Sequence, residues 1–152
     1  MNKVIIAIGT NVGNRKQNIK RALELLSKKI EILRMSSFYR TKPREGVSGG
    51  WFLNGVISAR TSMSPVILLR FLQSIENEMG RPVNHEKNTE RIIDLDILFY
   101  DNRVIRKPNL LIPHPKLTER KFVLKGLNQI EPEFVHPEKA TKISQLWKEL
   151  NK

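Results

Sequence analysis

The order of two apolar patterns along the chain most strongly constrains its fold. Short runs rich in β-branched and aromatic residues predict strands, whereas apolar residues recurring every three to four positions predict helices. The pattern predicts strand, helix, strand, strand, helix and strand over residues 4–8, 17–30, 32–41, 52–60, 64–80 and 92–100. This order is typical of the ferredoxin-like fold, an α+β arrangement in which both helices cover one face of the sheet.

The C-terminal part of the chain predicts smaller additions to this fold. A turn at Asp101-Asn102 precedes a short partner strand at 104–105, so we expect a C-terminal hairpin. Residues 121–130 and 143–150 have the periodicity of helices. Because two halves of about 75 residues would each have a marginal core, we expect one domain over residues 1–152.

Composition excludes several kinds of chemistry. The chain has no cysteine, which excludes disulfides, thiolate nucleophiles, cysteine-bound zinc and iron–sulfur clusters. The apolar run that ends at Gly9 is too short for a signal peptide, and no run approaches the roughly 18 apolar residues of a membrane span. We therefore expect a soluble cytoplasmic protein without membrane contact.

The balance of charge favours an anionic partner. The chain has 27 Lys and Arg against 15 Asp and Glu, a net charge of +12. Such a field attracts nucleic acids and small phosphorylated ligands, and it also favours solubility by itself. Charge alone leaves these three interpretations open.

Two carboxylates interrupt the last predicted strand. Asp94 and Asp96 are two residues apart, so both point to the same face with Cα atoms about 6.5–7 Å apart. Two such oxygen ligands suit Mg²⁺, which completes its octahedron with water and substrate phosphates. The alternative is a solvated face on which the aspartates pair with basic residues. Ile92 and Leu98 on the same face favour the metal site, because buried unpaired carboxylates are costly.

Basic residues and histidines form a second candidate group. Arg81 and Arg91 bracket the polar stretch before the aspartates, where two guanidinium groups would suit an anionic ligand, although each alone is more often solvated. His114 lies between two prolines, which predicts a rigid loop with or without a function. His85 and His136 have no partner at metal-ligand spacing, and we interpret them as surface histidines.

A carboxamide and aromatic rings form a third group. Asn54 is two residues from Phe52 on one strand face, an arrangement that either reads a flat heterocycle by hydrogen bonding and stacking or packs in the core. Phe122 offers a second ring, although a single Phe in a helix is usually a core residue. Segment 9–15 lacks the residues that define a P-loop or a dinucleotide-binding loop.

Seven short motifs, taken in order, carry a resemblance to a known family. They are Ile8-Gly9-Thr10-Asn11-Val12-Gly13-Asn14-Arg15, Ser36-Ser37-Phe38-Tyr39-Arg40-Thr41, Phe52-Leu53-Asn54, Gly80-Arg81, Arg91-Ile92-Ile93-Asp94-Leu95-Asp96-Ile97, Pro113-His114-Pro115 and Arg120-Lys121-Phe122-Val123-Leu124. Over about residues 4–135 the chain resembles the 6-hydroxymethyl-7,8-dihydropterin pyrophosphokinase family. The resemblance implies the ferredoxin-like fold, with ATP as co-substrate. It implies transfer of the terminal diphosphate of ATP to the pterin hydroxymethyl group, with release of AMP, in folate biosynthesis.

The resemblance also implies a role for each matching residue. Asp94 and Asp96 would hold two Mg²⁺ ions, and Arg81 and Arg91 would stabilise the transferring diphosphate. The residues implied to contact ATP are Gln73 and Glu76, both on the exposed side of the second helix, His114 and Arg120. The residues implied to bind the pterin are Thr41, Lys42, Pro43, Phe52, Asn54 and Phe122. With ATP and the pterin as small-molecule partners, we expect a monomer that does not bind nucleic acid.

The chain departs from the family pattern at some positions, which leaves alternatives open. Asn88 stands where an aromatic lid residue is common, so a catalytically altered pseudoenzyme of the same fold is one alternative. A ferredoxin-like RNA-binding module is another, since the net charge permits it. Such a module needs exposed aromatic residues on its central strands, and the first predicted strand has none.

Overall fold

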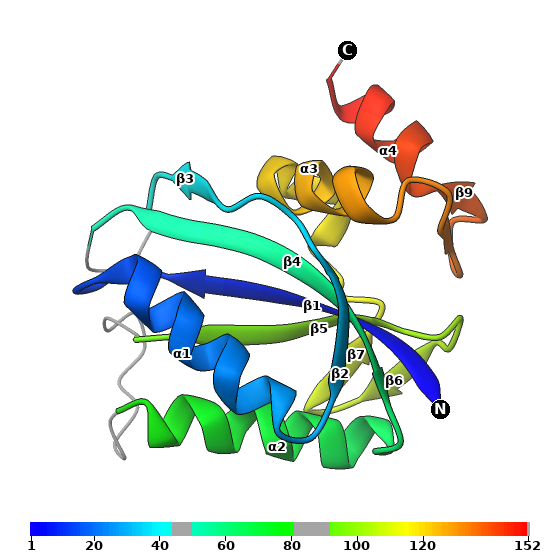
Figure 1. The fold of residues 1–152 in the computed structure, drawn as a ribbon. Coiled ribbons are helices and arrows are strands. Elements are labelled where there is room, and N and C mark those ends of the chain that lie inside the picture. The colour runs from blue at the N-terminus through cyan, green and yellow to red at the C-terminus, as the bar shows by residue number, and fades with distance from the viewer. Residues whose placement is uncertain (44–49, 81–91, 152) are drawn as a thin grey trace.

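A five-stranded antiparallel sheet forms the centre of the protein (Figure 1). The computed structural model describes residues 1–43, 50–80 and 92–151. The strands are β1 (Asn2–Thr10), β2 (Glu31–Met35), β3 (Tyr39–Thr41), β4 (Phe52–Thr61) and β5 (Asp94–Tyr100). They lie in the order β2-β4-β1-β5, with β3 also paired to β4. This order confirms the predicted ferredoxin-like arrangement.

Helices cover both faces of this sheet (Figure 1). Helices α1 (Arg15–Ser27) and α2 (Pro65–Glu78) lie on one face, and α3 (Lys121–Ile130) and α4 (Ile143–Leu150) on the other. Local signals define the helix starts. The Asn14 side chain accepts a hydrogen bond from the backbone N–H of Gln17 at 3.1 Å, and Ser64 caps α2 in the same way. Both helices that the sequence predicts on one face are confirmed.

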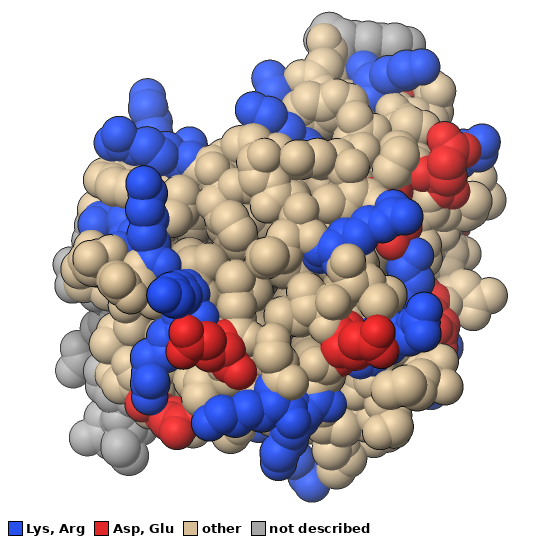
Figure 2. All heavy atoms as spheres, in the orientation of Figure 1, with Lys and Arg blue, Asp and Glu red and all other residues tan. Residues whose placement is uncertain are grey.

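Charged side chains are distributed widely over the surface. On the face shown in Figure 2, Lys and Arg lie in several separate groups, with Asp and Glu between some of them. Lys142 and Glu133, for example, form an exposed ion pair at 2.7 Å. On this face the net positive charge is therefore not gathered in one continuous patch.

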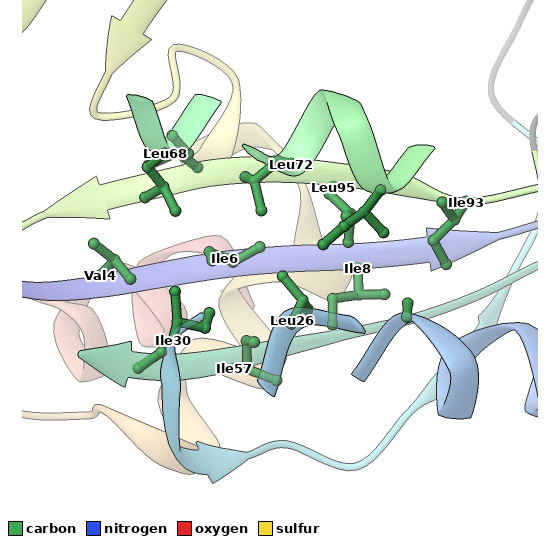
Figure 3. Close-up of a cluster of buried hydrophobic side chains, with 14 of the residues drawn as sticks. Val4, Ile6, Ile8, Leu26, Ile30, Ile57, Leu68, Leu72, Ile93 and Leu95 are labelled. Carbon is green, nitrogen blue, oxygen red and sulfur yellow. The ribbon is translucent and has the colours of Figure 1, made fainter. Parts of the chain in front are cut away.

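The first core lies between the sheet and helices α1 and α2 (Figure 3). Alternate residues of β1, Val4, Ile6 and Ile8, point into it and are buried. They pack with Leu26 of α1 and Leu72 of α2. Burying one large aliphatic side chain contributes about 1.5–3 kcal/mol, so this cluster is a main source of stability.

The second core lies on the opposite face, beneath α3 and α4. Ile5 of β1 and Phe99 of β5 belong to it. Gly126 allows α3 to approach the sheet closely, because a methyl group there would lie 2.8 Å from Val56. Toward the Gly9 end of β1, this face of the sheet is not filled by the core and carries a pocket.

The prediction of one strand over residues 32–41 is wrong, because two strands form there. Both β2 and β3 pair with β4, and the residues between them do not continue this pairing as a strand. Between them, the Ser36 hydroxyl oxygen accepts a hydrogen bond from the Val56 N–H at 2.9 Å and so replaces a backbone acceptor. The Phe38 ring then packs over Gly55, where a methyl group would lie only 2.5 Å from the ring.

The predicted partner strand after β5 forms a separate hairpin instead. β6 (Ile105–Lys107) pairs with β7 (Leu110–Ile112), and the turn at Asp101-Asn102 precedes it. A 3₁₀ helix, Leu117–Glu119, then leads to α3. A second small hairpin, β8 (Val135–His136) with β9 (Thr141–Lys142), joins α3 to α4. No helix in the described ranges is long and apolar enough to cross a membrane.

The interpretation of His136 as a surface residue is wrong. The residue is only 3% exposed, and its ring packs edge-on against Phe99 with centroids 5.5 Å apart. Its Nδ1 accepts hydrogen bonds from the backbone N–H groups of Glu138 and Lys139, both at 3.2 Å. Burial lowers the pKa of His136 below its usual value, because the charged ring would lose hydration. His85 lies outside the described residues.

We expect the buried His136 to make stability depend on pH. In the unfolded chain histidine takes up a proton near pH 6.5, whereas the folded protein resists this uptake. The unfolded state then binds more protons, so the free energy of unfolding falls as pH decreases through about 6.5. His136→Asn offers a carboxamide oxygen in place of the ring Nδ1 as acceptor for the same backbone N–H groups. Urea unfolding at pH 7.5 and 5.5 should show a smaller loss for the variant. Equal losses in both proteins would contradict this account.

Candidate active site

Three neighbouring strands place a glycine between two polar side chains. Gly9 of β1 lies opposite Asn54 of β4 and opposite Asp94 of β5. Two residues earlier, Ala7 lies opposite Asp96. The small residues of β1 therefore form a floor, with a carboxamide on one side and two carboxylates on the other. All of them line one pocket, which confirms that the two aspartates share a face.

The pocket over this floor is narrow. Its walls include Phe52 and Asn54 from β4, Asp94 and Asp96 from β5, and Phe122 from the first turn of α3. The space between the lining side chains is about 20 Å³, enough for about one water molecule. The structure therefore brings together the carboxamide, the two rings and the two carboxylates that the sequence analysis singled out.

Strand β3 holds the carboxamide in place. The Asn54 amide nitrogen donates to Thr41 Oγ1 at 2.5 Å, and Asn54 itself is buried. Thr41 also lies opposite Phe52 in the β3–β4 register. Lys42 and Pro43 follow β3 and are exposed. Of the three residues expected near the pterin here, Thr41 thus contacts the pocket wall and the other two face solvent.

A second, wider pocket lies across the edge strand β5. Its volume is about 320 Å³, and apolar residues of α2, β5 and the β6–β7 hairpin line it, among them Leu69, Ile97 and Leu111. Asp96 and His114 line this pocket and the narrow one as well. The two pockets therefore meet at one carboxylate and one imidazole.

Backbone hydrogen bonds orient His114 at this junction. Its N–H donates to the Leu98 carbonyl oxygen at 3.1 Å, and its Nδ1 accepts from the Lys116 N–H at 3.2 Å. In the neutral ring an accepting Nδ1 leaves the proton on Nε2. His114 is thus placed to donate a hydrogen bond from Nε2.

The expectation that Glu76 lies on the exposed side of its helix is wrong. Glu76 is 6% exposed, and its carboxylate accepts a hydrogen bond from the Leu95 N–H at 3.0 Å. The reason is that β5 is an edge strand whose outward N–H groups need acceptors, and α2 packs along that edge. Gln73, one turn after the pocket residue Leu69, is exposed as expected.

The carboxylates fit a divalent cation that binds together with phosphate. Asp94 is 9% exposed and Asp96 is half-buried. Within residues 1–43, 50–80 and 92–151, no group of three or more His, Asp or Glu side chains could hold a metal. Mg²⁺ needs no such group, since it usually binds through one or two carboxylates, water and substrate phosphates. The donor set therefore suits Mg²⁺ better than a metal held by protein ligands alone.

One arginine lies on the α3 side of the narrow pocket. Arg120, the residue before α3, lines it. Arg81 and Arg91 lie outside the described residues. Their described neighbours Gly80 and Ile92 lie close together, since a methyl group at Gly80 would be 2.9 Å from Ile92 Cδ1.

Sequence reasoning missed the floor of the site and the apolar pocket. Gly9 is predicted as the end of a strand, but β1 continues to Thr10. The small residues Ala7 and Gly9 at alternate positions indicate space above one face of the strand. Which side chains border that space depends on the pairing of β1 with β4 and β5. The strand that contains Leu111 has only three residues, which is too short for an apolar pattern to show which side chains face a pocket.

Comparison with known families decides between the pyrophosphokinase family and the RNA-binding module. Residues 5–132 match the 7,8-dihydro-6-hydroxymethylpterin-pyrophosphokinase (HPPK) family. The chain belongs to this family. The family resemblance of the seven motifs is thereby confirmed, and the RNA-binding module is no longer needed to explain the fold or the charge.

Relatives of the HPPK domain occur alone and within longer proteins. The chain is 40% identical to a 2-amino-4-hydroxy-6-hydroxymethyldihydropteridine pyrophosphokinase of Aquifex aeolicus, over 90% of this chain and 85% of the relative. It is 34% identical to the Bacillus subtilis protein of the same name, over 97% and 92%. It is 40% identical to the folic acid synthesis protein fol1 of Pneumocystis carinii over 97% of this chain, but spans only 20% of that protein.

Solved structures support the fold. The wild-type HPPK-DHPS of Plasmodium falciparum superposes with a TM-score of 0.81 at 18% identity. The match covers 97% of this chain and 43% of that one. At this level of identity the likeness concerns the HPPK fold alone.

The floor of the site makes a prediction about Gly9. Replacing glycine by alanine within a strand usually adds about 0.5–1 kcal/mol of stability. A methyl group at Gly9 would, however, lie 2.7 Å from Asn54 Oδ1. We therefore expect Gly9→Ala to lower the free energy of unfolding by about 1–3 kcal/mol, as overpacking does. Urea unfolding measures it.

A double-mutant cycle tests the cause of this loss. Asn54→Ala removes the side chain that the new methyl group would meet, so Gly9→Ala should cost much less stability in the Asn54→Ala background. An equal loss in both backgrounds would show that Asn54 does not limit the floor at Gly9.

Proposed function

We propose that the protein transfers the terminal diphosphate of ATP to the hydroxymethyl group of 6-hydroxymethyl-7,8-dihydropterin and releases AMP, in folate biosynthesis. The observation that carries this proposal is the meeting of two pockets at Asp96 and His114. One pocket offers aromatic rings and a carboxamide, and the other offers a wide apolar surface. Two ligands bound there would face each other across a carboxylate.

The narrow pocket suits the pterin. A flat heterocycle with hydrogen-bonding groups on its edge is recognised by stacking and by a carboxamide. Phe52 and Phe122 would stack on the pterin, while Asn54 and the backbone of residues 41–43 would bind its edge. A bicyclic ring needs more than the present 20 Å³, so side chains at the rim must move apart. Phe122, half-buried at the start of α3, is placed to do this.

The wide pocket suits the nucleotide. Its apolar lining, with Leu69 and Leu111, would hold the adenine ring, and Gln73 follows on the same helix face. His114 and Arg120 would bind phosphate oxygens, since Arg120 lines the adjoining pocket. Glu76, expected to contact ATP directly, is better described as a support of β5.

Asp94 and Asp96 would hold two Mg²⁺ ions at the junction. When bound, the metal supplies charge neutralisation for the phosphates. Glu76 would keep this part of β5 in place through its bond to Leu95 N–H, so the two flanking aspartates keep their spacing.

The reaction needs positioning more than a reactive side chain. The pterin hydroxyl oxygen attacks the β-phosphorus of ATP, the bond from that phosphorus to the oxygen of the α-phosphate breaks, and AMP leaves while the hydroxyl proton is lost. Groups that orient two substrates and neutralise charge account for most of the catalysis of such transfers. In this proposal Arg81 and Arg91 supply positive charge to the transferring group.

The assembly and location follow the same proposal. A monomer as the active form stays a prediction. A cytoplasmic location stays a prediction.

The product nucleotide tests the reaction. Incubation with ATP, Mg²⁺ and hydroxymethyldihydropterin should release AMP in proportion to the pterin consumed, because the transferred group is a diphosphate. Anion-exchange chromatography separates AMP from ADP. ADP as the main product would contradict the proposal, and binding of both ligands without turnover would favour the pseudoenzyme.

Asp96→Asn should slow turnover by about 100-fold or more, because it removes a charge at the junction of both pockets without changing side-chain size. Asp101→Asn is a matched control, since Asp101 accepts a hydrogen bond from Lys3 N–H in the turn after β5 and lines neither pocket. Steady-state rates and thermal unfolding of both variants decide the matter. An Asp96→Asn enzyme with near-normal turnover would show that this carboxylate is structural.

A further inference from the structure

Arg15 uses its side chain to connect two parts of the backbone. Nε–H donates to the carbonyl oxygen of Trp51 at 2.8 Å. The two terminal nitrogens donate to the carbonyl oxygens of Gly13 at 3.1 Å and Asn11 at 2.9 Å. Arg15 therefore ties the β1–α1 loop to the residue that precedes β4.

Two guanidinium groups lie over the ring of Trp51. The Cζ atoms of Arg15 and Arg40 lie 4.1 Å and 4.2 Å from its ring centroid. Both distances are within the range of cation–π attraction. Arg40 belongs to β3, where it lies opposite Leu53. The stack thus joins the β1–α1 loop, β3 and the start of β4.

Gly50 lets the guanidinium group of Arg15 approach. A methyl group at Gly50 would lie 2.7 Å from the Arg15 Nη2 and 3.7 Å from the Asn11 carbonyl oxygen. Any larger residue at this position would push the guanidinium group away from its acceptors.

The same loop also holds the other wall of the pocket. Thr10 Oγ1 donates to the carbonyl oxygen of Ile92 at 2.5 Å, two residues before Asp94. The Asn18 amide nitrogen donates to Thr10 Oγ1 at 3.1 Å and to the Val12 carbonyl oxygen at 2.9 Å. The segment 10–15, which matches no nucleotide-binding motif, therefore contacts Trp51 and Ile92, which precede the wall residues Phe52 and Asp94 of the narrow pocket.

We propose that Arg15 is a positioning residue for the pterin: by fixing Trp51 it holds Phe52 and Asn54, one and three residues later, at the spacing that the ring requires. The inference rests on the proposed function. Hydrogen bonds from a charged donor hold a backbone more firmly than neutral ones, and binding a flat ring between fixed walls depends on their separation. Arg15 itself does not line the pocket.

The test separates pterin binding from the rest of catalysis. Arg15→Met should raise KM for the pterin about tenfold, since it removes the charge-assisted hydrogen bond that holds Trp51 beside the wall and the two bonds that anchor this guanidinium group to the β1–α1 loop. kcat at saturating pterin and KM for ATP should stay within about twofold, because the nucleotide pocket is built from other elements. Arg40→Met is the matched control: it removes the other stacked guanidinium group but leaves the three carbonyl contacts, so its effect on KM should be smaller.

Gly50→Ala offers a second variant if Arg15→Met folds poorly, since it displaces the guanidinium group without removing it. It should raise KM for the pterin in the same selective way. In a Trp147→Phe background Trp51 is the one remaining tryptophan. Its emission, excited at a wavelength that tyrosine does not absorb, should change in Arg15→Met and Gly50→Ala. This readout does not depend on turnover.

The outcomes are distinguishable. A wild-type protein without AMP release would contradict the proposed function. A wild-type protein with AMP release, together with variants whose pterin KM is unchanged or whose two KM values and kcat change together, would contradict positioning by Arg15 while leaving the function intact.

Discussion

The pairing of β1 with β4 on one side and β5 on the other is the constraint on which the site depends. A side chain in a strand can face only one of two sides, and the register decides which residues of neighbouring strands share a row. In this protein the register puts Gly9 in one row with Asn54 and Asp94. A shift of one residue would turn both polar side chains toward the first core.

One face of the sheet carries the first core, and the other face carries the narrow pocket. Val4, Ile6 and Ile8 face α1 and α2, where burial of apolar surface stabilises the fold. The other face is filled by the second core only in part, so Ala7 and Gly9 can line a pocket. The residues of the pocket floor can therefore stay small.

The edge position of β5 explains why two pockets share one carboxylate. A strand with a neighbour on one side only is open to both faces and to solvent along its free edge. Glu76 occupies part of that edge through Leu95 N–H, and Asp96 remains at the border of both pockets. If β5 were a central strand, a second neighbouring strand would lie along its other edge and would separate the two pockets.

Local patterns in the sequence determined the elements and the chemical character of the site. Ser64 with Pro65 defined the start of α2, the spacing of Asp94 and Asp96 defined their common face, and the seven motifs identified the family. Tertiary structure decided the rest: that Ser36 divides one predicted strand, that His136 and Glu76 are buried, and that Gly9 lies between Asn54 and Asp94. The physical reason is that periodicity and capping act over a few residues, whereas burial and strand register depend on contacts between segments far apart in the chain.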